Sequence, residues 1–202
     1  ESVMFDTENL TEIPIYHSSI EMVEHNAEKS TIRLLYGSMD SSVCNKLFRR
    51  EIIGEIRFIK GRYNEDIIFL AKMFTRCSKM LQINDAFYRY RITDGSITHT
   101  FNERSLDPLR NVEDVSHIVH VAFPSCEKAL FYYKSNAIKT VATGIVRNKL
   151  LKIEPYTTAF KTACSYLQAN YLKILLNSDF DIRFKFAMTT LIIIKTMSKY
   201  SN

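Results

Sequence analysis

The stretch Tyr63-Asn64-Glu65-Asp66-Ile67-Ile68-Phe69 places two adjacent carboxylates at the start of a predicted helix. Asn64 is the expected N-cap, because its side chain can accept a hydrogen bond from a free backbone N–H of the first turn. The apolar residues that follow have helical spacing and predict a buried face, formed by Ile67, Ile68, Leu70, Ala71 and Phe74. The stretch therefore predicts an amphipathic helix that begins with an acidic pair.

Two interpretations of the Glu65-Asp66 pair remain open. The helix dipole favours acidic side chains in a first turn by about 0.3–1 kcal/mol, which explains the pair as a purely structural feature. Alternatively, one of the two carboxylates is a general base, which must be held within hydrogen-bond reach of the proton that it takes. A helix N-terminus holds a side chain rigidly and stabilises its anion, so it suits a base that must stay ionised.

Further blocks flank this pair in a definite order. They are Cys44-Asn45-Lys46-Leu47-Phe48, then Ile56-Arg57-Phe58, and after the pair Phe87-Tyr88-Arg89-Tyr90-Arg91 and Gly95-Ser96-Ile97-Thr98. The ordered set, within about residues 30–100, resembles the second half of the catalytic domain of bacterial family 2 glycosyltransferases, which have the GT-A fold. Cys44 departs from the family, which usually has a Trp there.

The resemblance implies an inverting glycosyltransferase. Such an enzyme transfers a sugar from a nucleotide-sugar donor to a glycan or lipid-linked acceptor, as in bacterial surface polysaccharide synthesis. Asp66 would take the proton of the acceptor hydroxyl, and Glu65 would orient the loop or the acceptor. The implied substrate-binding residues are Asn45, Lys46, Tyr88, Arg91 and Ser96.

Structural roles are the alternatives for several of these residues. Asn45 and Lys46 could instead fix their own loop by hydrogen bonds and an ion pair. Arg91 belongs to an alternating Tyr-Arg strand, so it is either a solvated side chain of an edge strand or a contact to a donor phosphate.

The resemblance also implies a divalent metal ion, Mg²⁺ or Mn²⁺, in the intact enzyme, and His99 is a candidate ligand. The Asp-x-Asp motif that would hold this metal does not occur before residue 44, and Asp179-Phe180-Asp181 lies between late helices. The chain is therefore expected to be the acceptor-side and C-terminal part of an enzyme, inactive as an isolated fragment and without a metal of its own. For His117 and His120, core packing is expected rather than metal binding.

The predicted fold class is α+β and mainly helical. Residues 1–103 are expected to form the acceptor-side half of a GT-A catalytic domain, and residues 104–202 a helical C-terminal bundle. The first part should contain extended pieces within residues 1–25, a helix over Asn26–Tyr36 capped by Asn26, a strand at Ile56–Phe58, and strands over Lys79–Ile83 and Phe87–Arg91 turned at Asn84-Asp85. The second should contain helices over Asp107–Val121, Ser125–Leu151, Pro155–Asn177 and Asp181–Tyr200.

The net charge of +5 lies in the second half of the chain. Basic surfaces attract nucleic acid, anionic lipid or phosphorylated ligands, but no dense Lys/Arg run or nucleic-acid motif occurs, so nucleic acid is not expected. The last helix is basic and amphipathic, so it either packs in the bundle or contacts an anionic membrane surface. Four separated cysteines without a CxxC pair indicate reduced thiols and a cytoplasmic protein, free or peripheral to the inner face of the plasma membrane.

Two further expectations follow. If the preceding half of the enzyme is absent, apolar surface around Ile56, Phe58 and Ile83 is left uncovered, which would favour a homodimer. The alternative function is a non-catalytic helical interaction or membrane-docking module, in which Glu65-Asp66 only caps a helix.

Overall fold

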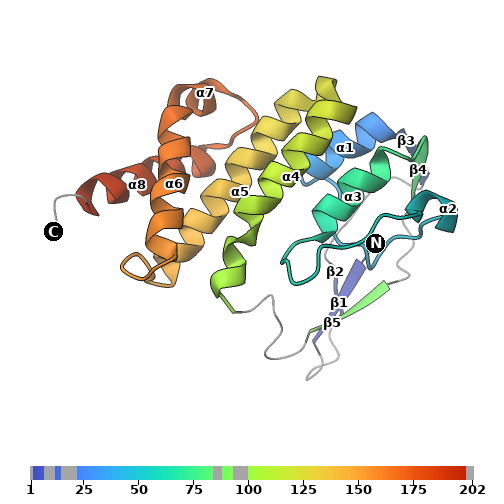
Figure 1. Cartoon of the computed structure of the whole chain (residues 1–202), viewed down its shortest axis with the longest axis horizontal. Coiled ribbons are helices and arrows are strands. Elements are labelled where there is room, and N and C mark those ends of the chain that lie inside the picture. Colours follow the sequence, from blue (N-terminus) through green and yellow to red (C-terminus); the bar gives the residue numbers. More distant parts are fainter. Residues whose placement is uncertain (1, 7–11, 15–21, 84–87, 93–99, 199–202) are drawn as a thin grey trace.

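The computed structural model describes residues 2–6, 12–14, 22–83, 88–92 and 100–198. In this part of the chain the fold is α+β and mainly helical, as predicted (Figure 1). The described strands all precede residue 93, and every described element after Thr100 is helical. The predicted change from a mixed first half to a helical second half is therefore confirmed.

The first half contains three helices, and the second half contains five helices and two short 3-10 turns among the described residues. The former are α1 (Ala27–Leu35), α2 (Arg50–Ile53) and α3 (Asp66–Phe74). The latter are η2 (Glu103–Leu106), α4 (Asp107–Ala122), η3 (Pro124–Cys126), α5 (Glu127–Arg147), α6 (Tyr156–Ala169), α7 (Tyr171–Leu176) and α8 (Ile182–Ser198).

The boundaries agree with sequence signals at some ends and depart from them at others. Asn26 caps α1 as predicted, because its Oδ1 accepts a 2.8 Å hydrogen bond from the Lys29 N–H. The helix predicted over Pro155–Asn177 is two helices, separated at Asn170. The Asn170 side chain donates to the Tyr166 carbonyl at 2.9 Å, and such local side-chain bonds are typical of helix ends.

The strands form two small sheets. Strands β1 (Ser2–Asp6), β2 (Glu12–Pro14) and β5 (Tyr88–Ile92) make one sheet in the order β2-β1-β5, in which β1 and β5 are parallel. Strands β3 (Met22–Asn26) and β4 (Lys79–Ile83) form an antiparallel pair.

Two strand predictions are corrected by this topology. Strands β4 and β5 both exist, but they pair with earlier strands in separate sheets rather than with each other; the predicted turn between them lies outside the described residues. The strand predicted at Ile56–Phe58 is not formed. Its backbone leaves α2 in a turn in which the Ile56 N–H bonds to the Ile53 carbonyl at 2.9 Å, and the Arg57 side chain bonds to nearby carbonyls.

The hydrophobic core runs the length of the helical layer. Helices α1, α3, α4 and α5 share one cluster that includes Leu34, Ile68, Val115 and Leu130. Helices α5, α6, α7 and α8 share a second cluster (Figure 1). The division at residues 103 and 104 stays a prediction, and helices from both sides of it pack into the first cluster.

Candidate active site

The acidic pair lies at the start of α3, as predicted. Asp66 is the first residue of the helix, and the Glu65 carbonyl accepts hydrogen bonds of 3.1 Å from the N–H groups of Ile68 and Phe69. The N-cap prediction for Asn64 is wrong: Asn64 has a left-handed backbone, with φ of 56°, and no side chain caps the helix. Asn tolerates this conformation better than most residues, so it turns the chain sharply into α3.

Helix α4 holds this turn in place. The fully buried Asn111 side chain donates from Nδ2 to the carbonyls of Tyr63 at 2.8 Å and Asn64 at 3.1 Å. Its Oδ1 accepts from Arg62 Nη1 at 3.2 Å, and Asp107 Oδ2 accepts from the Tyr63 N–H at 3.0 Å. The backbone immediately before Glu65-Asp66 is thus fixed by side chains more than forty residues later in the chain.

Residues 40–46 form a loop organised around the Lys46 ammonium. Its Nζ donates to the carbonyl oxygens of Asp40 and Ser42, both at 2.6 Å, and to Asn45 Oδ1 at 2.8 Å. Asn45 Nδ2 donates in turn to Asp40 Oδ2 at 3.0 Å. An ammonium has three donors, so these bonds can occupy all of them. This geometry agrees with the loop-fixing alternative for Asn45 and Lys46.

The loop and the helix meet at Asp66. The Val43 N–H donates to Asp66 Oδ2 at 3.3 Å. Burial raises the pKa of the Asp66 carboxyl, and the nearby Glu65 and Asp40 carboxylates raise it further, whereas the Val43 N–H and the Lys46 ammonium oppose the shift. The pKa of Lys46 is lowered by burial, against the attraction of Asp40 and Asp66. A half-buried, fixed carboxylate with raised proton affinity can act as a proton acceptor.

An aromatic cluster covers the neighbouring side of α3. Phe58 stacks on Phe69 with ring centroids 4.3 Å apart and an interplanar angle of 12°, and Phe48 meets Phe69 edge-on at 5.7 Å. Phe58 remains 47% exposed. The expected uncovered apolar surface is thus present at Phe58 and Ile83, but Ile56 is buried against Phe69, so for Ile56 the expectation is wrong.

The other residues implied by the resemblance stay predictions. Tyr88 and Arg91 lie on β5, where their backbones pair with Ser2 and Phe5 of β1. Ser96 and the expected metal ligand His99 lie outside the described residues.

The described residues do not fit the implied metal. Within residues 22–83 and 100–198, no group of three or more His, Cys, Asp and Glu side chains could hold an ion. Asp179 instead accepts a 2.8 Å bond from the Tyr36 hydroxyl and pairs with Lys128 at 3.0 Å. Asp181 caps α8, because its Oδ1 accepts from the Phe184 N–H at 2.7 Å.

The expectation of core packing for the α4 histidines is wrong. His117 and His120 are both exposed, and His120 Nδ1 forms an ion pair with Glu127. Their i, i+3 spacing places the two histidines on one side of α4. This is the outer side, because Val112, Val115 and other residues form the buried side.

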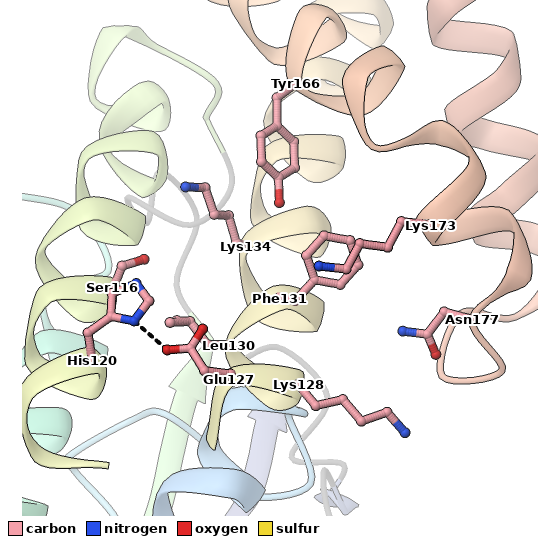
Figure 2. A pocket seen from close by; sticks show the side chains of 10 residues that line it. All are labelled: Ser116, His120, Glu127, Lys128, Leu130, Phe131, Lys134, Tyr166, Lys173 and Asn177. Atoms are coloured by element: carbon pink, nitrogen blue, oxygen red, sulfur yellow. Dashed lines mark ion pairs between the residues drawn. The ribbon is translucent and has the colours of Figure 1, made fainter. Parts of the chain in front are cut away.

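A hollow of about 440 Å³ opens near the C-terminal end of α4, and His120 is one of the residues that line it (Figure 2). Its charged groups already have partners: Lys134 lies 5.3 Å from the Tyr166 ring and Lys173 lies 4.0 Å from the Phe131 ring. Ser116, the lining residue of α4 nearest to Asn111 in the sequence, is still more than one turn away from it. The hollow therefore adds no group to the Asp66 site.

Comparison with known proteins points to glycosyl transfer. No family model matches the chain. Over 105 residues it is 26% identical to Glycosyltransferase GlyA of Streptococcus pneumoniae serotype 4, and the match covers 51% of this chain and 15% of that protein. This is a distant similarity to a glycosyltransferase, and it supports a general relationship to such enzymes. In the described part of the chain, no helix is long and apolar enough to cross a membrane.

Sequence reasoning missed Asn111 and Asp107, whose side chains hold the turn before the acidic pair. The available signal was their position among apolar residues in the first turns of a predicted helix. A buried polar side chain must find a hydrogen-bond partner, so such a residue predicts a specific contact to another segment. Sequence alone did not say which segment that is.

Proposed function

We propose that this chain provides the acceptor side of an inverting, family 2-like glycosyltransferase with the GT-A fold, and that Asp66 is its general base. The observation that carries the proposal is the Asp66 carboxylate, which is half-buried at the start of α3 and held by the Val43 N–H. The distant similarity to a glycosyltransferase supports the reaction class.

In the proposed reaction, the acceptor hydroxyl attacks the anomeric carbon of a nucleotide sugar. Its proton passes to Asp66 as the new glycosidic bond forms, and the bond to the nucleoside diphosphate breaks on the opposite face of the sugar. Configuration at the anomeric carbon is inverted because there is a single displacement. Burial raises the pKa of Asp66, which strengthens the carboxylate as a base.

Supporting roles follow from the contacts around Asp66. Lys46 and Asn45 stabilise the loop that contributes Val43, and Lys46 also favours the ionised form of Asp66. Glu65 orients the loop or the acceptor. We assign donor and acceptor contacts to Tyr88, Arg91 and Ser96 on the strength of the family resemblance, and Arg91 would neutralise a phosphate of the leaving group.

A divalent ion is part of the proposed intact enzyme, where Mg²⁺ or Mn²⁺ would bind the donor pyrophosphate. The described residues do not form a site for this ion. We propose a glycan or lipid-linked acceptor and a cytoplasmic location, as expected for a transferase of bacterial surface polysaccharide synthesis.

Replacement of Asp66 tests this function in the full-length protein. Asp66→Asn keeps the shape of the side chain but cannot accept a proton, so transfer should fall by about 10²–10⁴ while the KM for the nucleotide sugar changes little. Glu65→Gln is the matched control and should cost less. The measurement is release of nucleoside diphosphate and glycosylated product with a panel of nucleotide sugars.

Wild-type turnover by Asp66→Asn would overturn the assignment. The Glu65-Asp66 pair would then be a helix-start feature, and the non-catalytic interaction module would be the better description of this chain.

A further inference from the structure

Helix α8 has two apolar faces, and only one of them is covered. Phe184, Met188 and Leu191 are buried in the second core cluster. On the opposite side, Ile182, Phe186, Ile193 and Met197 are exposed by 79%, 74%, 52% and 64%. At about 100° per residue their spacing confines them to an arc of roughly 60°, so they form a stripe along one side of the helix.

Basic side chains border this stripe. Arg183 lies on one side of Ile182 on the helical wheel and Lys185 on the other, and Arg183 is exposed. No Asp or Glu occurs after Asp181 in the chain. The stripe is therefore flanked by positive charge on both sides at its N-terminal end.

Helix α7 also has exposed apolar side chains. Leu172 and Leu176 are both largely exposed, and Lys173 stands between them in the sequence. The Tyr171 hydroxyl lies 3.4 Å from Thr189 Oγ1, which joins the start of α7 to the middle of α8. Figure 1 shows α8 at the end of the molecule opposite α3 and the strands.

We propose that the exposed faces of α7 and α8 dock onto a membrane leaflet rich in anionic phospholipid. Apolar side chains would enter the boundary between headgroups and acyl chains, while Arg183 and Lys185 meet lipid phosphates. Apolar residues bordered by Lys and Arg are the pattern of helices that lie in the plane of a membrane interface. The inference does not rest on the proposed sugar transfer.

Charge favours a membrane over a second copy of this chain. A two-fold dimer formed through the stripe would bring the same surface of both copies together. Where the two helices pair in parallel, the Arg183 and Lys185 margins face like charges, and in either orientation α8 has no carboxylate to compensate them. An anionic bilayer supplies the opposite charge along the whole surface.

The chain contains no Trp, so a single introduced Trp reports on its own surroundings. In Phe186→Trp, fluorescence should shift to the blue and gain intensity when vesicles of phosphatidylcholine with 30% phosphatidylglycerol are added, and should change much less with phosphatidylcholine alone. Val121→Trp is the matched control, because Val121 is also 74% exposed but lies at the end of α4. Its emission should stay unchanged.

Vesicle co-sedimentation separates the apolar and charged contributions. Phe186→Ser with Ile193→Ser should lower the partition coefficient on anionic vesicles by tenfold or more. Arg183→Gln with Lys185→Gln should reduce the preference for anionic over neutral lipid and the sensitivity to salt. Arg49→Gln with Lys60→Gln removes the same charges from another exposed region and should bind as the wild type does.

Because all the replaced side chains are exposed or at a helix margin, circular dichroism should show unchanged folding. The proposal is overturned if the wild type does not bind anionic vesicles. It is also overturned if Arg49→Gln with Lys60→Gln loses as much binding as the variants of the stripe. It is also overturned if light scattering finds a dimer that Phe186→Ser with Ile193→Ser dissociates while vesicles remain unbound, because the stripe would then be an interface between copies.

Discussion

Oδ2 of Asp66 accepts a hydrogen bond of 3.3 Å from the backbone N–H of Val43. This contact connects the first residue of α3 to the loop organised by Lys46. The loop therefore determines both the position of the Asp66 carboxylate and the position of the Lys46 ammonium near it. The pH dependence of the proposed reaction should therefore respond to changes in the loop as well as to changes in Asp66 itself.

The first prediction concerns Lys46. Because burial raises the pKa of Asp66, the acid limb of kcat/KM should lie above the usual carboxyl value of 3.8. Lys46→Met removes a cation that favours the ionised form, so the limb should move to still higher pH, with transfer lost first at the acid end. Lys60→Met, at an exposed position, serves as the control and should leave the profile unchanged. An unchanged limb in Lys46→Met would contradict the assignment of Asp66 as the titrating base.

The second prediction concerns the contact between α4 and the turn at Asn64. Asn111→Ala should lower the free energy of unfolding by about 1–3 kcal/mol, because two carbonyl groups lose their donor in a partly buried place. Urea denaturation measures this change. Asn148→Ala removes an exposed amide that also bonds to a carbonyl, and it should change stability by about 0.5 kcal/mol or less.

Gly144 provides the third prediction. A Cβ atom at this position of α5 would lie 2.3 Å from Phe101 Cε2, so Gly144→Ala should destabilise the protein by about 1–3 kcal/mol despite the better helix propensity of Ala. In a Phe101→Ala background the same change should become neutral or stabilising by up to about 1 kcal/mol. Thermal or urea unfolding of the four variants forms a double-mutant cycle, and additive effects would argue against this contact.

The fourth prediction concerns His25 of β3, which is 2% exposed. Burial lowers its pKa below 6.5, and the Arg33 and Lys29 charges lower it further. The unfolded chain then binds a proton more readily than the folded one, so stability is complete above pH 6.5 and falls as the pH drops from there toward the folded-state pKa. Urea midpoints between pH 7.5 and 5 should show this loss.

Two variants identify the responsible group. His25→Phe should flatten this part of the pH dependence, whereas the exposed His117→Gln should keep it. A flat profile in the wild type would show that His25 does not govern stability in this range.

Local sequence signals predicted the elements better than their contacts. The spacing of apolar residues after Asp66 gave α3, and Asn26 gave the start of α1. The left-handed backbone of Asn64 was missed because Asn also favours the N-cap position. The contact that accompanies the left-handed turn, a hydrogen bond from Asn111 to the Asn64 carbonyl, comes from a distant helix. The parallel pairing of β5 with β1 was missed because partner choice is set by long-range packing, which the spacing within a strand does not reveal.

The candidate site was also predicted in part, because its residues were named but its contacts were not. Glu65 and Asp66 were candidates from their residue types and their place at a helix start, and Asn45 and Lys46 from the family resemblance. The structure brings Lys46 and Asp66 close enough to influence each other's pKa. The contributions of Val43 and Asn111 could not be predicted, because one acts through its backbone N–H and the other from a distant helix.

The anchoring of the 61–64 turn by α4 limits how this protein can be divided or recombined. A gene cut between residues 103 and 104 would keep Asp66 on one product and leave Asp107 and Asn111 on the other. The acidic pair therefore cannot be transferred without the start of α4. Chimeras that exchange the helical half for that of another protein must preserve a hydrogen-bond donor at position 111 and an acceptor at position 107. Crossovers placed before α1 or after α5 would keep these contacts within one parent.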